Sequence, residues 1–302
     1  MSWTDFPNGV TSMGVPLPSA GRDISGSTYF VDNNSGSDSN DGSSWRKAFK
    51  TLARAVTISN LDIARGSDRW ARRNTIYYCA DTETADLVAF PNKCDVIGMG
   101  SYDANTKPGI TGNHVPVNSG NYGTRFINVW FKAPADASPI VTLASTTSGC
   151  QFIDCVFDAT ATTTIGIQAT ASPFLQVINC DFRGAFVTSN ITFGTGEAGR
   201  TIIKGNRMTG SAAAGIVLGS GTTASWEIVI DGNFIEAATL VIDDNSDSGT
   251  GIAYVVDNRL ISLASSTTGY AENMDINLGR AAGNYLTTPN IATIYPILDT
   301  TT

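Results

Sequence analysis

The sequence is poor in charge, in histidine and in long apolar runs. Only 15% of its 302 residues are charged, and 27 acidic residues against 19 basic ones give a formal net charge of −8. Nucleic-acid binding needs a concentrated positive surface, so this balance argues against nucleic acid as a partner. There is no apolar run of about 18 residues, the length that predicts a membrane span. His114 is the only histidine, so we expect a loop residue and no histidine-based catalytic triad.

Cysteine is scarce too, and its spacing excludes a zinc site. The five cysteines lack the paired spacing of metal ligands, and an odd number does not close a set of disulfides. The first residues also lack the basic and apolar regions of a secretory signal, which predicts synthesis in a cytoplasm. We therefore expect reduced thiols, mostly buried as small apolar side chains. They are Cys79, Cys94, Cys150, Cys155 and Cys180.

What the chain does contain is a repeat of 25 to 27 residues. Short apolar runs recur with Asn, Asp, Cys or Gly in the middle, as in Val229-Ile-Asp-Gly-Asn-Phe-Ile235. When the runs are aligned on the residue two before the final hydrophobe, successive runs are 26, 25, 26, 27, 25 and 26 residues apart. The aligned residues are Val129, Cys155, Cys180, Asn206, Asn233, Asn258 and Asn284.

This period predicts an all-β right-handed parallel β-helix, in which coils of three short strands and three turns are stacked. Each strand would pair with the same strand of the coils above and below, ~4.8 Å away. The final hydrophobes then form one inward column, and the four asparagines form a ladder at a sharp turn. The inward column is Phe131, Phe157, Phe182, Met208, Ile235, Leu260 and Leu286.

Two pairs of opposite charges fall at the same phase of neighbouring coils. Asp158 precedes Arg183 by one coil, and Asp181 precedes Arg207. Opposite charges on adjacent strands contribute roughly 0.2–1 kcal/mol each. We interpret these pairs as ladder ion pairs and not as catalytic groups.

Residues 28–75 precede the regular coils and are interpreted as a cap. Phe49, Leu52, Ala53 and Val56 follow the spacing of one face of an amphipathic helix, and a solenoid needs its open end covered. The chain is thus divided into an extended arm (1–27), the cap (28–75), a β-helix (76–288) and an extended tail (289–302).

The cap also carries a family resemblance. Tyr29-Phe-Val-Asp32, Gly36-Ser-Asp38, Asp41-Gly42 and Phe49-Lys-Thr-Leu52-Ala53 resemble the entry segment of the pectate-lyase-like β-helix superfamily. Val96-Ile-Gly-Met-Gly100 resembles its first turn, and with the coils the resemblance covers residues 28 to 288. It implies the fold and not the function, because the superfamily holds lyases, hydrolases, epimerases, adhesins and phage proteins.

The arm resembles the openings of tailed-phage virion proteins, often decoration or head-associated ones. Its prolines and glycines exclude a continuous helix or a central strand, and its apolar side chains suit an extended path in a groove of a partner. The predicted attachment residues are Trp3, Phe6, Pro7, Val10, Met13, Val15 and Leu17.

We also examined the chain for catalytic groups. The resemblance implies that lyases of this fold use calcium held by aspartates plus a basic residue, and that hydrolases use a pair of carboxylates. The acidic residues at 32, 38 and 41 and in the run 243–247 are interpreted as turn residues. We therefore predict no catalytic residue, no metal and no cofactor. The best catalytic set would be Asp158, Asp181, Arg183, Arg207 and Glu236.

These observations predict a tailed-phage virion structural protein that is not an enzyme. We expect a trimeric decoration or cement protein on the capsid exterior, with the major capsid protein and its own copies as partners, and neither nucleic acid nor a membrane. The alternative is a tailspike, a receptor-binding protein or a depolymerase that acts on host surface polysaccharide. A free polysaccharide lyase is disfavoured by the missing signal and carboxylate cluster. The predicted trimer contacts, outward aromatics of one phase, are Trp130, Phe234 and Tyr285.

Overall fold

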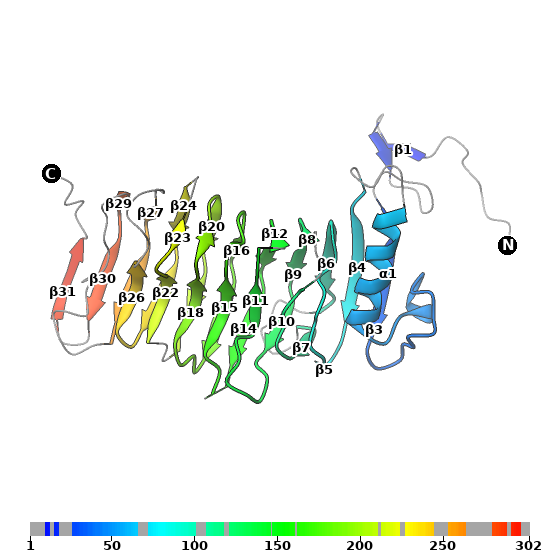
Figure 1. The fold of residues 1–302 in the computed structure, drawn as a ribbon, viewed down its shortest axis with the longest axis horizontal. Coiled ribbons are helices and arrows are strands. Elements are labelled where there is room, and N and C mark those ends of the chain that lie inside the picture. The colour runs from blue at the N-terminus through cyan, green and yellow to red at the C-terminus, as the bar shows by residue number, and fades with distance from the viewer. Residues whose placement is uncertain are drawn as a thin grey trace.

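The computed structural model describes residues 10–12, 15–17, 26–65, 72–100, 107–117, 121–145, 147–160, 162–210, 213–223, 227–244, 253–263, 280–288 and 291–296. Over these residues the chain forms a right-handed parallel β-helix with one α-helix at its N-terminal end (Figure 1). The predicted fold class is confirmed.

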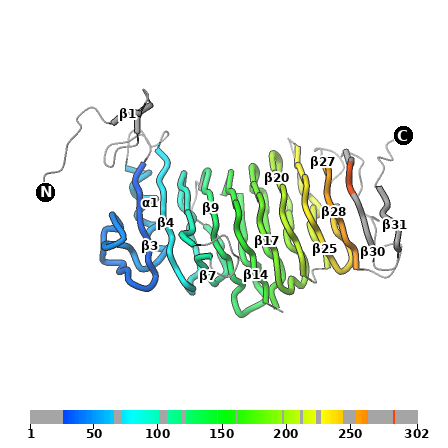
Figure 2. Tube along the Cα trace, turned by 180° about the vertical axis from the view of Figure 1, so that it is seen from behind, coloured from blue at the N-terminus to red at the C-terminus, as the bar shows by residue number. Residues whose placement is uncertain are grey.

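Three sheets run along the solenoid, and Figure 2 shows their strands stacked from the N-terminal to the C-terminal end. Sheet 1 contains β3 (Thr28–Asp32), β4 (Asn74–Cys79), β6 (Cys94–Gly98), β9 (Arg125–Ile127), β13 (Gln151–Ile153), β16 (Gln176–Ile178), β20 (Thr201–Lys204), β24 (Ile228–Asp231), β27 (Ala253–Val256) and β29 (Arg280–Ala282). Sheet 2 contains β5 (Glu83–Thr84), β7 (Gly109–Thr111), β10 (Trp130–Lys132), β14 (Val156–Ala159), β17 (Asp181–Gly184), β21 (Arg207–Met208), β25 (Phe234–Ala237), β28 (Arg259–Ser262), β30 (Tyr285–Thr288) and β31 (Ile291–Pro296).

Sheet 3 is shorter and completes each coil. It contains β11 (Val141–Leu143), β15 (Ile165–Ala169), β18 (Ser189–Phe193), β22 (Ala214–Leu218) and β26 (Leu240–Asp244). Two further parallel pairs lie at turns: β8 (Asn121–Tyr122) with β12 (Thr147–Ser148), and β19 (Gly196–Glu197) with β23 (Thr222–Thr223). Within the three sheets the described pairs are parallel, except that β31 pairs antiparallel with β30.

The turn from sheet 1 to sheet 2, which we call the exit turn, repeats in seven coils. Its first residue has a φ between 53° and 66°, the left-handed region that Gly, Asn and Asp adopt at least cost. Every coil supplies one of these three residue types, so the sequence fits the backbone at each repeat. The seven residues are Asn128, Asp154, Asn179, Gly205, Gly232, Asp257 and Gly283.

The next residue of the exit turn points inward and forms the asparagine ladder. The Asn206 side-chain and backbone N–H groups both donate to Asn233 Oδ1 at 2.9 Å, and Asn233 donates in the same way to Asn258. Asn258 donates to Asn284 Oδ1, while Cys180 N donates to Asn206 Oδ1. All four amides are buried, so the ladder satisfies polar groups that would otherwise be costly.

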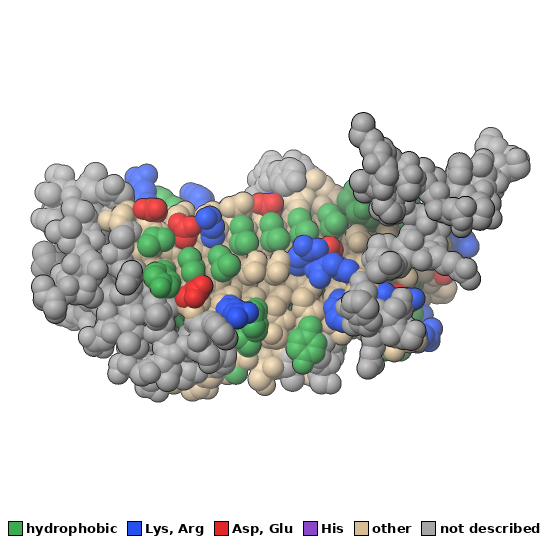
Figure 3. Space-filling model, turned by 90° about the horizontal axis from the view of Figure 1, so that it is seen from above, with side chains coloured by type: hydrophobic (Ala, Val, Ile, Leu, Met, Phe, Trp, Pro, Cys, Tyr) green, Lys and Arg blue, Asp and Glu red, His purple; other side chains and the backbone are tan. Residues whose placement is uncertain are grey.

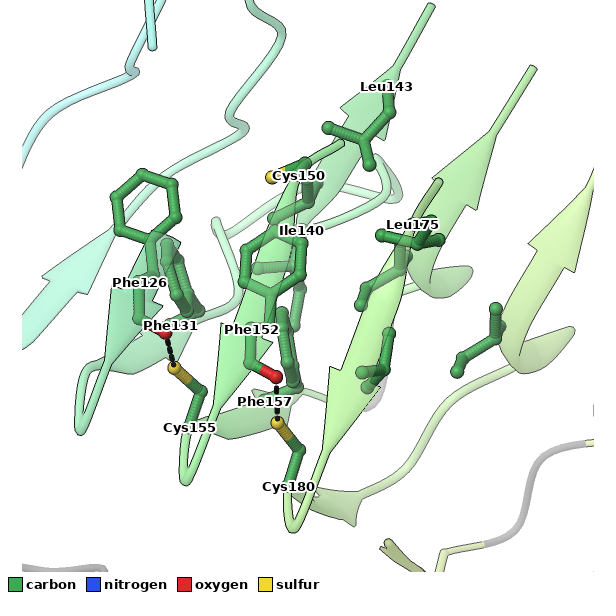
Figure 4. Close-up of a cluster of buried hydrophobic side chains, with 14 of the residues drawn as sticks. Phe126, Phe131, Ile140, Leu143, Cys150, Phe152, Cys155, Phe157, Leu175 and Cys180 are labelled. Atoms are coloured by element: carbon green, nitrogen blue, oxygen red, sulfur yellow. Dashed lines mark hydrogen bonds between the residues drawn. The ribbon is translucent and has the colours of Figure 1, made fainter. Parts of the chain in front are cut away.

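Aromatic rings fill the centre of the first coils (Figure 4). Phe131, Phe157 and Phe182 stack in one column with centroids 5.3 and 4.6 Å apart, as the predicted inward column requires. Cys155 and Cys180 lie at the adjoining turns, where each thiol contacts a backbone carbonyl oxygen at 3.4 Å. The five cysteines are free, and four of them are buried.

The N-terminal end is covered by helix α1 (Leu52–Arg65), which follows a short 3₁₀ helix, η1 (Trp45–Lys47). Leu52 and Val56 are buried as predicted, but Ala55 is buried where we expected Ala53, because Phe49 precedes the helix and does not set its phase. Both carboxylate oxygens of the buried Glu83 accept the Leu52 N–H at 3.1 Å and so cap the helix.

The predicted arm is only partly covered by the described residues. β1 (Val10–Ser12) and β2 (Val15–Leu17) pair as an antiparallel hairpin, whereas Trp3, Phe6, Pro7 and Met13 lie outside the described residues. The role of the arm in attachment and the proposed domain boundaries remain predictions. Among the described helices, none has the length and apolar character needed to cross a bilayer.

Candidate functional site

The outer face of sheet 1 carries two rows of side chains along the solenoid (Figure 3). One row is apolar over six strands, from Phe30 in β3 to Ile178 in β16, and then becomes charged with Lys204 and Asp231. The other row is polar at the N-terminal end and apolar at the C-terminal end. Its members are Asp95, Arg125, Gln151, Gln176, Ile202, Val229 and Tyr254.

A hollow of about 520 Å³ lies at the edge of this face, where the chain enters sheet 1 from sheet 3. Its size is that of a small-molecule site. Three successive strands supply its walls, because Gln176, Ile202 and Val229 are partners in the ladder of β16, β20 and β24. The lining residues are Phe174, Gln176, Arg200, Thr201, Ile202, Glu227 and Val229.

The residue two before the polar row, in what we call the entry turn, also adopts positive φ. Gly123 (66°) and Gly149 (68°) fill this position in two coils, and Phe174 (63°) and Arg200 (56°) fill it in the next two. For a bulky residue this conformation is a true outlier and costs roughly 1–2 kcal/mol. Lys93 (47°) fills the same position in the coil before Gly123, so a bulky residue there does not by itself mark a site. Phe174 and Arg200 differ from Lys93 because they line the hollow, where their side chains can contact a ligand.

The two strained side chains contact each other at the mouth of the hollow. The Arg200 guanidinium carbon lies 5.3 Å from the centroid of the Phe174 ring, a cation–π contact. Phe174 remains 38% exposed, which leaves part of the ring open to a ligand. Gln176 and the exposed Glu227 also line the hollow.

The hollow thus offers an apolar ring, a guanidinium, an amide and a carboxylate. An aromatic ring can pack against the C–H face of a sugar, while the planar polar groups accept and donate hydrogen bonds to hydroxyl groups. This combination suits a carbohydrate better than a purely apolar ligand. Sequence reasoning missed the site, because no charge cluster or motif marks it.

The residues that we had considered for catalysis lie on sheet 2 and form ladder ion pairs. Arg183 Nη2 is 3.2 Å from Asp158 Oδ2, and Arg207 Nη1 is 3.5 Å from Asp181 Oδ1. Both pairs join strands of neighbouring coils, as the register predicts. Glu236 lies in β25 and, like the ion pairs, does not line the hollow.

The predicted trimer residues share one column of sheet 2, but the column is not continuously aromatic. Trp130 is separated from Phe234 by Val156, Asp181 and Arg207, and Phe234 from Tyr285 by Arg259. Cations lie over two of the rings: Lys132 Nζ lies 3.8 Å from the Trp130 ring centroid, and Arg259 Cζ lies 5.4 Å from the Phe234 ring centroid. The homotrimer therefore remains a prediction.

His114 lies between the named strands, as expected for a loop residue, but its side chain is part of the interior. It forms a bridge with Val141, is fully buried, and accepts the Leu87 N–H on Nδ1 at 3.2 Å. Burial lowers the pKa of His114 to about 4, and the nearby charge of Asp86 only partly opposes this. The ring is therefore neutral at pH 7, and its role is structural.

The acidic loop of the cap is a set of turns, as we had interpreted it. Asp38 Oδ1 accepts the N–H groups of Lys50 and Thr51, and Asp41 Oδ1 accepts the N–H and the hydroxyl O–H of Ser43. Over the described residues no group of three or more His, Cys, Asp or Glu side chains is placed to hold a metal ion. Of the second acidic run, Asp243 and Asp244 end β26, and residues 245–247 lie outside the described residues.

Comparison with known proteins identifies the class of fold. No family model and no curated sequence matches the chain. Among solved structures it is similar to pectate lyase Pel9A (12% identity, 88% of this chain and 78% of that one, TM-score 0.48). It is also similar to a rhamnogalacturonan lyase (12% identity, 78% of this chain and 69% of that one, TM-score 0.35). A third similar structure is a lacto-N-biosidase from Eubacterium ramulus (9% identity, 86% of this chain and 68% of that one, TM-score 0.25).

The strand pairing of the described residues gives the parallel β-helix fold that the cap and the repeat predict, and the similar structures are polysaccharide-active proteins. The prediction that the protein is not an enzyme is contradicted by the two lyases among the similar structures, which are enzymes, and it is not retained. At 9–12% identity the likeness concerns the fold, and it assigns no catalytic residue in this chain.

Proposed function

We propose that this protein binds and acts on a polysaccharide, with the hollow at the entry turn as its binding site. The observation that carries the proposal is that Phe174 and Arg200 adopt consecutive left-handed positions and line the hollow, whereas the two preceding coils have glycine and the coil before those has Lys93, which does not line it. The backbone strain at these two residues is explained if both side chains contact a ligand, because the binding energy then offsets the strain.

The groups available for chemistry in the hollow are Glu227 and Arg200, which lie at equivalent positions of neighbouring coils. A carboxylate positioned at a glycosidic oxygen or a ring carbon can act as a general acid or base. Glu227 is therefore assigned the role of general acid or base towards a bound glycan. Arg200 is assigned an electrostatic contact with the same substrate.

Of the two functions predicted from the sequence, this proposal develops the second, a tailspike, receptor-binding protein or depolymerase. The capsid decoration role, the arm as anchor and the virion location remain predictions. Labelling the protein in purified phage particles tests the location independently of any glycan.

The proposal is tested with a panel of acidic and neutral polysaccharides. Binding is measured by calorimetry, and cleavage is measured by reducing ends and unsaturated products. Phe174→Gly should lower the affinity about tenfold, or 1.4 kcal/mol. The matched control is Phe234→Ala, since Phe234 has a similar contact with Arg259 at 5.4 Å but lies on sheet 2. Absence of binding across the panel, or equal loss in both variants, would refute the proposal.

A further inference from the structure

Sheet 3 has one irregular position in each of four successive coils. The parallel ladder that joins β15, β18, β22 and β26 omits one residue from each of these strands. Each omitted residue is buried together with the residue that follows it, although successive side chains of a regular strand point to opposite faces. The omitted residues therefore form an additional inward column, which we call the kink column: Gly166, Asn190, Gly215 and Val241.

Asn190 is the polar member of the kink column. Its side chain is 0% exposed, and neither Oδ1 nor Nδ2 has a hydrogen-bond partner among the described residues. In the exit turn, by contrast, the buried amides of Asn206 and Asn233 are bonded to the neighbouring coils. A buried amide without partners is costly, so Asn190 needs hydrogen bonds from a group other than these side chains and strands.

The two glycines of the kink column bring further polar groups into the same place. A methyl group at Gly166 would lie 2.5 Å from the backbone oxygen of Asn190, and one at Gly215 would lie 2.5 Å from that of Val241. A carbonyl oxygen of the next coil thus occupies the place of each missing side chain, which only glycine permits. The amide of Asn190 and these carbonyl groups therefore share one column inside the solenoid.

From this arrangement we infer that the kink column is an internal hydration site, in which bound water accepts a hydrogen bond from Asn190 Nδ2 and donates one to Oδ1. Water fits because it both donates and accepts, and buried water typically makes about three hydrogen bonds to otherwise unsatisfied groups. The kink column contains no acidic side chain, which disfavours a metal cation. None of its residues lines the hollow, so the inference is independent of the proposed function.

The test compares two replacements of Asn190. Asn190→Leu keeps the approximate size of the side chain and removes both polar atoms. Water magnetic relaxation dispersion, which detects slowly exchanging internal water, should show the loss of at least one such molecule relative to the wild type. Asn190→Ser keeps a hydroxyl group and leaves more room, so it should retain the water. The matched control is Thr192→Val, a partly exposed position of the same strand, which should behave as the wild type.

A crystal structure of the wild type is the second measurement, and it remains decisive if Asn190→Leu does not fold. We expect electron density for water within hydrogen-bond distance of Asn190 Oδ1 or Nδ2. Equal amounts of slowly exchanging water in the wild type and in folded Asn190→Leu would overturn the inference. Density in which both amide atoms bond directly to protein groups, with no water beside them, would overturn it as well.

Discussion

The two turns that flank sheet 1 have the same left-handed backbone conformation but differ in the residue types that adopt it. In the exit turn all seven left-handed positions hold Gly, Asn or Asp. In the entry turn Gly123 and Gly149 are followed by Phe174 and Arg200, also at positive φ. The residue types of the exit turn thus follow from the backbone alone. In the entry turn Lys93, Phe174 and Arg200 oppose the backbone preference, and of these Phe174 and Arg200 line the hollow.

The two turns also differ in what their side chains face. The exit turn directs its next residue inward, where the amides from Asn206 to Asn284 bond from coil to coil. The entry turn directs Phe174 outward to the hollow. Stability should therefore depend on the exit turn, and ligand affinity on the entry turn.

The largest expected effect is on the exit turn. Asn233→Leu removes the acceptor of Asn206 N and Nδ2 and the donor to Ile203 O, so several buried groups lose their partners. Because each unsatisfied group costs about 1–3 kcal/mol, the free energy of unfolding should fall by about 3 kcal/mol or more. Chemical denaturation measures the loss. Asn233→Cys, which copies positions 155 and 180 of the same column, should cost less, and equal losses would weaken the ladder account.

A second effect of similar size is the pH dependence of stability that the buried His114 produces. His114 has a pKa of about 4 in the folded protein against 6.5 for the ordinary side chain. As pH falls below 6.5 the unfolded chain binds this proton first, so stability is complete above 6.5 and is lost towards pH 4, by about 3 kcal/mol.

Denaturation at pH 7 and pH 5 measures about 2 kcal/mol of this loss. His114→Asn is the comparison, since its side-chain oxygen can replace Nδ1 as the acceptor of Leu87 N–H. Burial raises the pKa of Glu83, which contributes with the opposite sign and is common to both proteins. A pH dependence unchanged by His114→Asn would contradict the assignment to this histidine.

An exchange of residue types within the entry turn should have an intermediate effect. Gly149→Phe should cost about 1–2 kcal/mol from the left-handed backbone, because a Cβ at Gly149 meets no atom closer than 3.5 Å. Phe174→Gly relieves a similar strain but increases the entropy of the unfolded chain, so stability should rise or stay within about 1 kcal/mol. Thermal and chemical denaturation compare the two. A large destabilisation by Phe174→Gly would show that the ring is structural.

The smallest effect is expected away from both turns. Asp158→Asn breaks a partly exposed ladder pair with Arg183 and should change stability by less than about 1 kcal/mol. Binding and turnover of any polysaccharide should not change. Loss of turnover in this variant would indicate that the catalytic groups lie on sheet 2.

The repeat made the fold predictable because burial and backbone demands recur in every coil. The inward column from Phe131 to Leu286 and the ladder register follow directly from a period near 26 residues. The phase of α1 did not follow, since Phe49 packs in the core from outside the helix. The burial of His114 did not follow either, because local composition does not reveal its bridge to Val141.

The candidate site was not predictable from composition or motifs, since it consists of one residue from each of several coils. One signal was present in the aligned coils: two residues before each sheet 1 strand position, glycine at 123 and 149 gives way to Phe174 and Arg200. Only the structure shows that these positions require positive φ, and hence that the change is costly.

The central claim is that Phe174 and Arg200 are retained for ligand binding at the expense of backbone strain. It is tested most directly by measuring polysaccharide affinity and unfolding free energy on the same preparation of the double variant Phe174→Gly/Arg200→Gly. We expect affinity to fall by tenfold or more while stability is unchanged or higher. Unchanged affinity together with a loss of stability would contradict the claim, because the two side chains would then serve the fold.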